Sequence, residues 1–440
     1  MTREKAMAKE IYAAARAALK AKPDHLELAR KTLAAIGPGN VIHAGQSFWR
    51  WTGSGVWNEC DDKAIKQHVQ RTLEANGTAV NSSTVSGVTD VLRNDIYRQD
   101  HTFNIGKPDV VNCRNGELEL NENGWILHRH RREHYRTTQI PVIYDPAAHA
   151  PRFWQFLHDV FRDDHDRDAK MWSVLELIGY TLMSHANHER FVMLVGTGGN
   201  GKSVLLRVIE ALAGSRNVAG VQPSQFDNKF QRANLHMKLA NIVTELKQGE
   251  IIADAELKAI TSGELTTVEK KNRDPFEMRA FATCWFGTNH LPHTRDFSDA
   301  LFRRAVILTF NRSFSDAEQD HNLKDKLISE LPGILNYALG SYTRAIVNGF
   351  TVPTSSLEAK QKWRMEADQV AQFVVERCID DPSGRIAVDE IYRKFRDWTT
   401  HSGVRNVVGK QAMGDRLERL GYMRKRSNGS WITGLSLRTM

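Results

Sequence analysis

The chain has 440 residues, more than a single hydrophobic core commonly holds, so two to four domains are expected. Hydrophobic residues make up 41% and charged residues 25%, the balance of a globular protein. No apolar run approaches the roughly 20 residues of a bilayer-spanning helix, and the first residues lack the apolar core of a signal peptide. The sequence therefore predicts a cytoplasmic protein (of the host, if a phage encodes it) without a membrane partner.

The positions of the cysteines and of the charged residues further limit the functional classes to which the protein can belong. The four cysteines are scattered without a CxxC pair, which argues against a zinc site or a disulfide framework. The net charge is +8, yet residues 385–440 carry 12 Lys/Arg against 5 Asp/Glu, whereas the rest holds 48 against 47. Basic character confined to one end suggests a polyanion partner. A solvated basic tail is the alternative.

The first 145 residues predict a mixed α/β domain. A helix over 1–36 ends at Gly37-Pro38-Gly39, because glycine and proline interrupt a helical pattern. Two β-like runs, a helical stretch and then two or three short strands with Asn-Gly turns follow; they span 47–53, 56–60, 62–75 and 109–130. The loop from Pro141 to Pro151 marks the predicted boundary to a second domain, 146–350.

That second domain carries the most informative segment. After a helical region over 152–186, five apolar residues, Phe191 to Val195, predict a buried strand, and a helix then runs to Gly214. The loop between them fits GxxxxGK[ST]. The predicted nucleotide-binding residues are Gly196, Thr197, Gly198, Gly199, Asn200, Gly201, Lys202, Ser203 and Val204. Alternating strands and helices continue to about residue 345, which predicts an α/β P-loop core.

This loop predicts a site for ATP and Mg²⁺. Its glycines let backbone N–H groups curl around phosphates, and the following helix N-terminus adds partial positive charge. Lys202 supplies a point charge to the outer phosphates, and Ser203 a ligand for Mg²⁺. Since kinases, GTPases, motors and helicases share this loop, residues further along the chain have to discriminate between them.

Polar side chains at the ends of later apolar runs complete the predicted site. Glu245 follows one run, where a carboxylate holds the water shell of the metal and orients the attacking water. Asn289 follows the next, where an amide senses the γ-phosphate. Arg303 and Arg304 precede a further strand, and an arginine offered to a neighbouring subunit's ATP neutralises transition-state charge. The alternative interpretation is that each of these polar residues is an ordinary surface residue beside a strand.

The order of these features resembles the superfamily 3 helicases. More closely, the chain is similar to the helicase part of phage and plasmid primase-helicases, related to the poxvirus NTPase. The supporting phrases are LVGTGGNGKS, ITSGELTTVEKKNRDPFEMR, WFGTNHLP and FRRAVILTF. Three further phrases resemble the domain that precedes this ATPase: FNIGKPDVVNCRNGELEL, VIYDPAAHAPRFWQFLHDVF and LELIGYTLM. The resemblance covers about residues 40–435 and implies an AAA+ type core.

The resemblance also implies roles for individual residues. It makes Asn289 the sensor and Arg304, rather than Arg303, the finger that acts across subunits of a hexameric ring, because its spacing to the next strand's end fits better. Many superfamily 3 helicases have two acidic residues where this chain has Thr244-Glu245. Glu245 is therefore expected to act alone or with help from Glu250.

The insert from Glu264 to Arg279 corresponds to a hairpin that projects into the central channel in this family. Its expected tip residues are Lys270, Lys271, Asn272 and Arg273. Basic residues at a hairpin tip hold backbone phosphates without reading sequence. A solvated charged loop is the alternative.

The last segment, 351–440, follows a Pro/Ser-containing linker and predicts a winged helix. Apolar spacing indicates three helices, and two β-like runs flank a turn at 427–430. Basic side chains would charge the third helix and the wing: Arg416, Arg419, Arg424, Lys425 and Arg426. Winged helices also bind proteins, so DNA and protein both stay open as partners.

The sequence as a whole favours ATP-driven unwinding of single-stranded or forked DNA in the replication of a phage, plasmid or other mobile element. No primase domain fits before residue 40, so a separate primase or initiator is expected to supply priming. One competing interpretation is an AAA+ ATPase that remodels protein complexes, and another is a small-molecule kinase, which needs no arginine from a neighbour. The histidines of 128–134 are interpreted as part of a basic loop, because no second motif completes a metal site.

Overall fold

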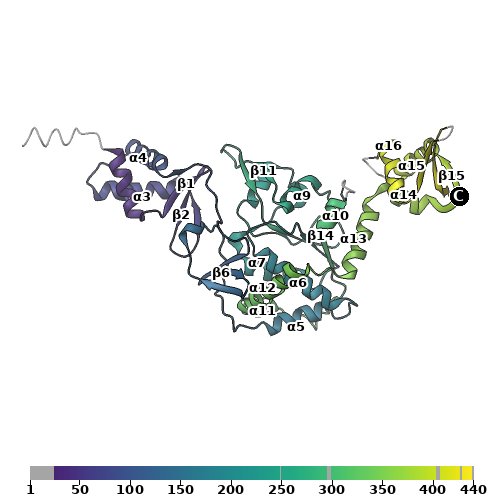
Figure 1. Ribbon diagram of the computed structural model, residues 1–440, viewed down its shortest axis with the longest axis horizontal. Coiled ribbons are helices and arrows are strands. Elements are labelled where there is room, and N and C mark those ends of the chain that lie inside the picture. The colour runs from purple at the N-terminus through teal and green to yellow at the C-terminus, as the bar shows by residue number, and fades with distance from the viewer. Residues whose placement is uncertain (1–23, 248, 295–298, 403–406, 427–428, 439–440) are drawn as a thin grey trace, which may run out of the picture. The chain divides into compact units, whose positions relative to one another are not determined.

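The computed structural model describes residues 24–247, 249–294, 299–402, 407–426 and 429–438 (Figure 1). They form two compact units. The first comprises the described residues up to Tyr144 together with Glu269–Phe276, and the second comprises Asp145–Val268 and the described residues from Glu277 onward. No described helix combines the length and apolar character needed to cross a bilayer. The part of the predicted first helix before Asp24 lies outside the described residues.

The first unit packs three helices against a small sheet. The helices are α2 (His25–Ile36), α3 (Asp62–Ala75) and α4 (Ser82–Asp95). Asp24, Asp61 and Asn81 cap them, each accepting a hydrogen bond from a first-turn backbone N–H. The sheet has the order β3-β2-β1-β4, built from β1 (Val41–Ala44), β2 (Ser47–Trp51), β3 (Trp57–Cys60) and β4 (Tyr97–Arg98). Apolar residues from these helices and strands form one buried cluster.

A second sheet in this unit confirms the predicted short strands. It has the order β5-β6-β7, from β5 (Val110–Cys113), β6 (Gly116–Asn121) and β7 (Gly124–His128). All neighbours pair antiparallel, and both connections are two residues long. The predicted mixed α/β character of this region is therefore confirmed.

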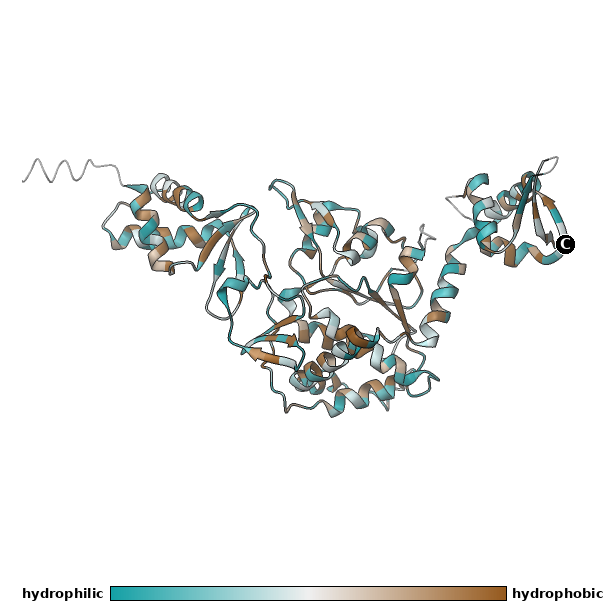
Figure 2. Cartoon of the chain, in the orientation of Figure 1, coloured by the Kyte–Doolittle hydropathy of each residue, from teal (hydrophilic) through white to brown (hydrophobic). Residues whose placement is uncertain are grey.

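The second unit is built on a five-stranded parallel sheet with the order β14-β8-β13-β10-β9. Its strands are β8 (Phe191–Val195), β9 (Val218–Ala219), β10 (Ala240–Val243), β13 (Thr283–Thr288) and β14 (Ala305–Thr309). Apart from the two-residue β9, the strands are almost wholly buried, which explains why the sequence reads as continuous apolar runs instead of alternation. Figure 2 shows this apolar core in brown. The predicted α/β class is confirmed.

Helices cover both faces of this sheet. In Figure 1, α6, α7 and α12 lie on one side of the strands, and α9 and α10 on the other. The helices are α5 (Pro151–Val160), α6 (Arg167–Thr181), α7 (Lys202–Ala213), α8 (Lys229–Arg232), α9 (Asp254–Ser262), α10 (Asp299–Arg304), α11 (Leu323–Ile328) and α12 (Leu331–Asn348). The predicted charged insert is a two-stranded sheet of β11 (Leu265–Val268) and β12 (Phe276–Arg279). The single helical region predicted over 152–186 is two helices, α5 and α6.

The predicted linker at residue 351 is largely wrong. A helix, α13 (Thr354–Ala367), begins three residues later and packs against β14. The hydroxyl of Ser356 accepts a hydrogen bond from the backbone N–H of Ile307 at 3.1 Å. Trp363 is 1% exposed, and its indole N–H donates to the carbonyl oxygen of Pro292 at 2.7 Å. This helix therefore belongs to the core of the parallel sheet, and the small C-terminal module starts after it.

The remaining chain forms a small module with its own core. Its elements are α14 (Gln369–Arg377), β15 (Cys378–Ala387), α15 (Val388–His401), α16 (Lys410–Arg419), β16 (Met423–Arg426) and β17 (Ser430–Leu437). The three predicted helices and the final hairpin are present. The sequence did not predict β15, because its Asp-Pro-Ser-Gly stretch is typical of a loop. In the structure this stretch coincides with a register shift against β17 between Asp381 and Arg385.

The close crossing of α6 and α12 yields a stability prediction. A Cβ on Gly179 would lie 2.4 Å from the carbonyl oxygen of Ala338 and 2.6 Å from Cβ of Tyr342. Gly179→Ala is therefore expected to lower the free energy of unfolding by about 1–3 kcal/mol through overpacking. Gly340→Ala, on exposed α12 surface with no atom within 4 Å of the added Cβ, is the matched control. It should gain about 0.5–1 kcal/mol from helix propensity. Thermal unfolding of both variants checks this, and equal midpoints would contradict the packing argument.

Candidate nucleotide-binding site

The phosphate loop connects the carboxyl end of β8 to α7, as predicted. Gly201, which immediately precedes α7, has φ +88°, a left-handed conformation that strains any other residue. A Cβ at Gly196 would lie 2.4 Å from the carbonyl oxygen of Phe310. Gly201 is therefore required by its backbone conformation and Gly196 by close approach, independently of any ligand.

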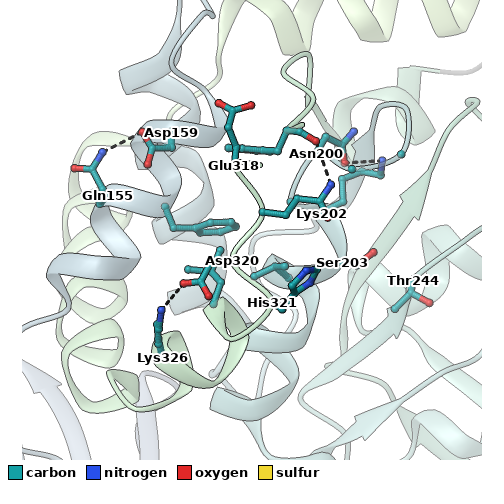
Figure 3. A pocket seen from close by; sticks show the side chains of 18 of the residues that line it. Gln155, Asp159, Asn200, Lys202, Ser203, Thr244, Glu318, Asp320, His321 and Lys326 are labelled. Carbon is teal, nitrogen blue, oxygen red and sulfur yellow. Dashed lines mark hydrogen bonds and ion pairs between the residues drawn. The ribbon is translucent and has the colours of Figure 1, made fainter. Parts of the chain in front are cut away.

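The loop borders a cavity of about 750 Å³ (Figure 3). This volume lies in the range of small-molecule sites. Figure 3 shows Gln155 and Asp159 on one side of the view and Thr244 on the other, with Lys202 and Ser203 between them. The lining residues that the sequence predicted are Gly198, Gly199, Asn200, Gly201, Lys202, Ser203, Val204, Glu245 and Asn289.

Lys202 lies folded onto its own loop. Its side chain is largely buried, with the ammonium 2.5 Å from the carbonyl oxygen of Gly196 and 2.9 Å from that of Thr197. A third hydrogen bond runs to Oδ1 of Asn200 at 3.0 Å. Burial lowers the pKa of Lys202, and the nearby carboxylate of Glu245 partly opposes that shift. Gly196 and Thr197, which do not line the cavity, thus act here by positioning the lysine.

Strand register brings the distant polar residues to the same cavity. Thr288 pairs with Val195 across β13 and β8, so Asn289 follows at the start of the phosphate loop. On the other side of β13, Val243 of β10 pairs with Phe286, which places Glu245 close by. The carboxyl ends of parallel strands meet at one edge of a sheet. Hydroxyl and carboxylate oxygens such as those of Ser203 and Glu245 are ligands that suit Mg²⁺.

Glu250 does not join this group. It is absent from the residues that line the cavity, and its carboxylate accepts a hydrogen bond from the hydroxyl of Ser224 at 2.7 Å. The expectation that Glu250 assists Glu245 is therefore not supported by the geometry. Glu245 is the acidic residue that strand β10 presents to the cavity.

Arg303 and Arg304 lie at the amino ends of the parallel strands, opposite the ends that the cavity borders. Because Ala305 pairs with Phe191 in parallel register, Arg303 and Arg304 stand beside the start of β8, while the phosphate loop follows its end. At about 3.3 Å per residue, the length of β8 separates them from the loop by roughly 16 Å. Neither arginine therefore lines the nucleotide cavity of its own chain.

The two arginines differ in exposure, whereas the preference for Arg304 over Arg303 stays a prediction. The side chain of Arg304 is 8% exposed, with its guanidinium 2.7 Å from Glu189 and 2.8 Å from the hydroxyl of Ser262. The side chain of Arg303 is 65% exposed and 3.5 Å from the same glutamate. Arg303 is therefore the more accessible of the two, whereas Arg304 is paired within its own chain.

One side of the cavity comes from residues that the sequence analysis missed. From α5 and the segment after β14, they are Arg152, Gln155, Phe156, Asp159, Phe314, Glu318, Gln319, Asp320, His321, Leu323 and Lys326. Gln155 donates to Asp159 at 3.0 Å, and Lys326 pairs with Asp320 at 2.6 Å. The backbone N–H of Phe314 donates to the carbonyl oxygen of Gly199 at 2.9 Å, which attaches this segment to the phosphate loop. In the sequence, the polar residues Gln155 and Asp159 on one face of α5 are the signal that could have indicated this side of the cavity.

The remaining predicted residues lie elsewhere. In the first unit, Lys270 and Arg273 contact Glu59, while Lys271 and Asn272 are exposed. In the C-terminal module, Lys425, Arg426 and Arg419 are exposed, Arg424 donates to the hydroxyl of Ser430 at 3.2 Å, and Arg416 pairs with Asp368 at 3.2 Å. Of the histidines in 128–134, His130 contacts the carbonyl oxygen of Cys113, and His134 lies 2.7 Å from Glu117. The predicted wing cations are therefore only partly available.

Three family models match successive parts of the chain. Residues 6–162 match "D5 N terminal like", residues 194–304 match "Family of unknown function (DUF5906)", and residues 365–434 match "Poxvirus D5 protein-like". The middle match runs from β8 to Arg304 and so includes the phosphate loop, Glu245 and Asn289.

Solved structures of low sequence identity share the fold. The apo structure of the NrS-1 C-terminal region (305–718) is 12% identical with a TM-score of 0.53, and covers 94% of this chain and 100% of that one. The A form of the NrS-1 C-terminal region is 14% identical with a TM-score of 0.50 over 95% of this chain and 100% of that one.

Curated relatives come from viruses. "Putative helicase 022R" of Frog virus 3 (isolate Goorha) is 25% identical over 255 residues, 51% of this chain and 26% of that protein. "Putative helicase 121R" of Invertebrate iridescent virus 3 is 22% identical over 366 residues, 73% of this chain and 38% of that protein. The chain thus spans well under half the length of these relatives. Together, the terminal family matches and the viral relatives show that the chain belongs to the poxvirus D5-like primase-helicase family.

Proposed function

We propose that the chain is an ATP-dependent DNA helicase of the superfamily 3 type, working as a hexameric ring in the replication of a viral or other mobile DNA. One observation carries this proposal. Lys202, Ser203, Glu245 and Asn289 share one cavity, while the exposed Arg303 stands at the opposite edge of the same sheet. An exposed arginine that does not line the cavity of its own chain fits an assembly in which it reaches the nucleotide site of a neighbouring subunit.

In the proposed reaction the protein binds and orients ATP and water. Lys202 holds the outer phosphates, and Ser203 contributes a hydroxyl to Mg²⁺, which neutralises charge on the phosphates when bound. Glu245 orients the attacking water, and Asn289 contacts the γ-phosphate. Arg303 of an adjacent subunit stabilises the charge that develops in the transition state.

DNA is the proposed substrate of the work that hydrolysis drives. The tip between β11 and β12 presents the exposed cation Lys271. The C-terminal module has the element order of a winged helix, and its hairpin carries exposed Lys425 and Arg426. Such cations fit backbone phosphates. We assign single-stranded or forked DNA as the substrate and a separate primase or initiator as a partner. Strand displacement on forked DNA with ATP, together with stimulation of ATPase by single strands, tests this function against protein remodelling.

Lys202→Ala is expected to abolish ATP hydrolysis while the fold persists, because the substitution removes a phosphate-binding charge and little of the apolar core. The measurement is phosphate release, with the thermal unfolding midpoint as the control for folding. A purified variant that keeps most of its ATPase would falsify the assignment of this cavity as the catalytic site.

Arg303→Ala is expected to bind ATP normally but to hydrolyse it about 10³-fold more slowly, the lower end of known effects of trans-acting arginines. Arg303→Lys keeps the charge but loses the guanidinium fork, so it should recover only part of the rate. Mixing Arg303→Ala with Lys202→Ala should restore some activity, because one mixed interface then has both intact sides. The idea fails if verified mixed assemblies hydrolyse no faster than the separate preparations.

Lys271→Ala is expected to preserve basal ATPase but to reduce DNA-stimulated ATPase and strand displacement. Losing one phosphate contact should also flatten the dependence of log binding constant on log salt by about 0.7 for single strands. Lys63→Ala, at an exposed lysine of the same unit, is the matched control. Normal displacement by Lys271→Ala, and also by a triple variant with Lys270 and Arg273 changed, would remove the tip from the DNA-binding surface.

A further inference from the structure

Two of the three cations at the hairpin tip bind one carboxylate of the first unit. The ammonium of Lys270 lies 3.0 Å and 3.1 Å from the two carboxylate oxygens of Glu59 on β3. The guanidinium of Arg273 lies 3.4 Å from one of the same oxygens. Glu59 therefore receives both cations at once, in the way that a single phosphate does.

The surroundings of Glu59 complete an anion-like site for the tip. The hydroxyl of Ser47, on β2, donates to Glu59 at 2.6 Å and accepts from Arg273 at 2.9 Å. The side-chain amide of Gln46 donates to the backbone carbonyl of Asp274 at 2.8 Å. These contacts hold both the side chains and the backbone of the tip against the start of β2.

The turn of the tip separates its cations into two classes. Asn272 has φ +61°, a left-handed conformation that asparagine tolerates, and the N–H of Arg273 donates to the carbonyl oxygen of Lys270 at 3.0 Å. This turn directs Lys270 and Arg273 toward Glu59. Lys271, between them, is exposed and makes no ion pair with any residue that the structure describes.

The ion pairs of Lys270 and Arg273 with Glu59 are partly exposed to solvent, so replacing Glu59 by another anion costs little free energy. The side chains of Lys270 and Glu59 are 34% and 32% exposed, and that of Arg273 is 39% exposed. Ion pairs with this much solvent contribute little to stability. A DNA phosphate offers the same two features that Glu59 uses, which are one negative charge and two accessible oxygens.

We propose that Glu59 occupies, on Lys270 and Arg273, the place of a DNA backbone phosphate, so that DNA gains these two cations only by displacing Glu59. This inference rests on the proposed DNA binding by the tip, and it names the regulation of that site. Lys271 makes the first phosphate contact, and Lys270 and Arg273 follow once Glu59 is released. A structural strut, with Glu59 merely anchoring the tip, is the competing explanation.

The test measures the affinity of the full chain for fluorescent oligothymidylate by anisotropy at fixed salt. Glu59→Gln keeps an acceptor for Ser47 but removes the competing charge. It is expected to tighten binding about twofold to fivefold, the range that a partly exposed ion pair corresponds to. Glu122→Gln, at an exposed position in the turn between β6 and β7, removes the same charge from the same unit away from the tip and should change nothing.

A double-mutant cycle separates competition from a general charge effect. In a Lys270→Ala/Arg273→Ala background, Glu59→Gln should no longer alter affinity, because the contested cations are gone. Equal or weaker binding by Glu59→Gln than by wild type, or an increase that persists in that background, would overturn the proposal. If wild type and Glu59→Gln both fail to bind DNA, the proposed function itself falls. If DNA affinity depends on Lys271 but is unchanged by Glu59→Gln, the proposed competition between Glu59 and DNA is wrong, while the proposed DNA binding stands.

Discussion

The parallel register of β8 with its two neighbours is the constraint on which the site depends. β13 and β14 flank β8, and all three strands run in the same direction. Everything that follows the carboxyl ends, including the phosphate loop and Asn289, is therefore gathered at one edge. Whatever precedes the amino ends, including Arg303 and Arg304, is set at the other. A single geometric rule thus separates the nucleotide cavity from the arginine pair within each chain.

Local sequence was sufficient wherever one short segment determines the structure. The phosphate loop is set by its own glycines and by the strand and helix on either side, and Glu245 and Asn289 follow buried apolar runs directly. The missed wall of the cavity joins α5 to a segment about 150 residues later in the chain. Its residues share no motif, so their proximity arises only from tertiary packing.

The misassigned features have equally physical causes. An Arg-Arg pair does not reveal which side chain is buried, and here Arg304 is buried against Glu189 and Ser262 while Arg303 is exposed. The polar run before α13 is typical of a linker, yet the helix gains its place through Trp363 and Ser356. The charges at the hairpin tip were correctly located, but their partner Glu59 lies more than 200 residues earlier, beyond the reach of any local pattern.

The helix α13 has a consequence for how the protein can be divided. β14 is the edge strand of its sheet, and an open edge exposes N–H groups that pair readily with other chains. The hydroxyl of Ser356 satisfies one exposed group of that edge by accepting a hydrogen bond from the backbone N–H of Ile307. The ring of Trp363 packs 4.9 Å from that of Phe302. A fragment cut at residue 350 would uncover this edge and invite aggregation. An isolated fragment of the parallel-sheet core should instead extend to Ala367, so that it includes the helix that covers the edge strand.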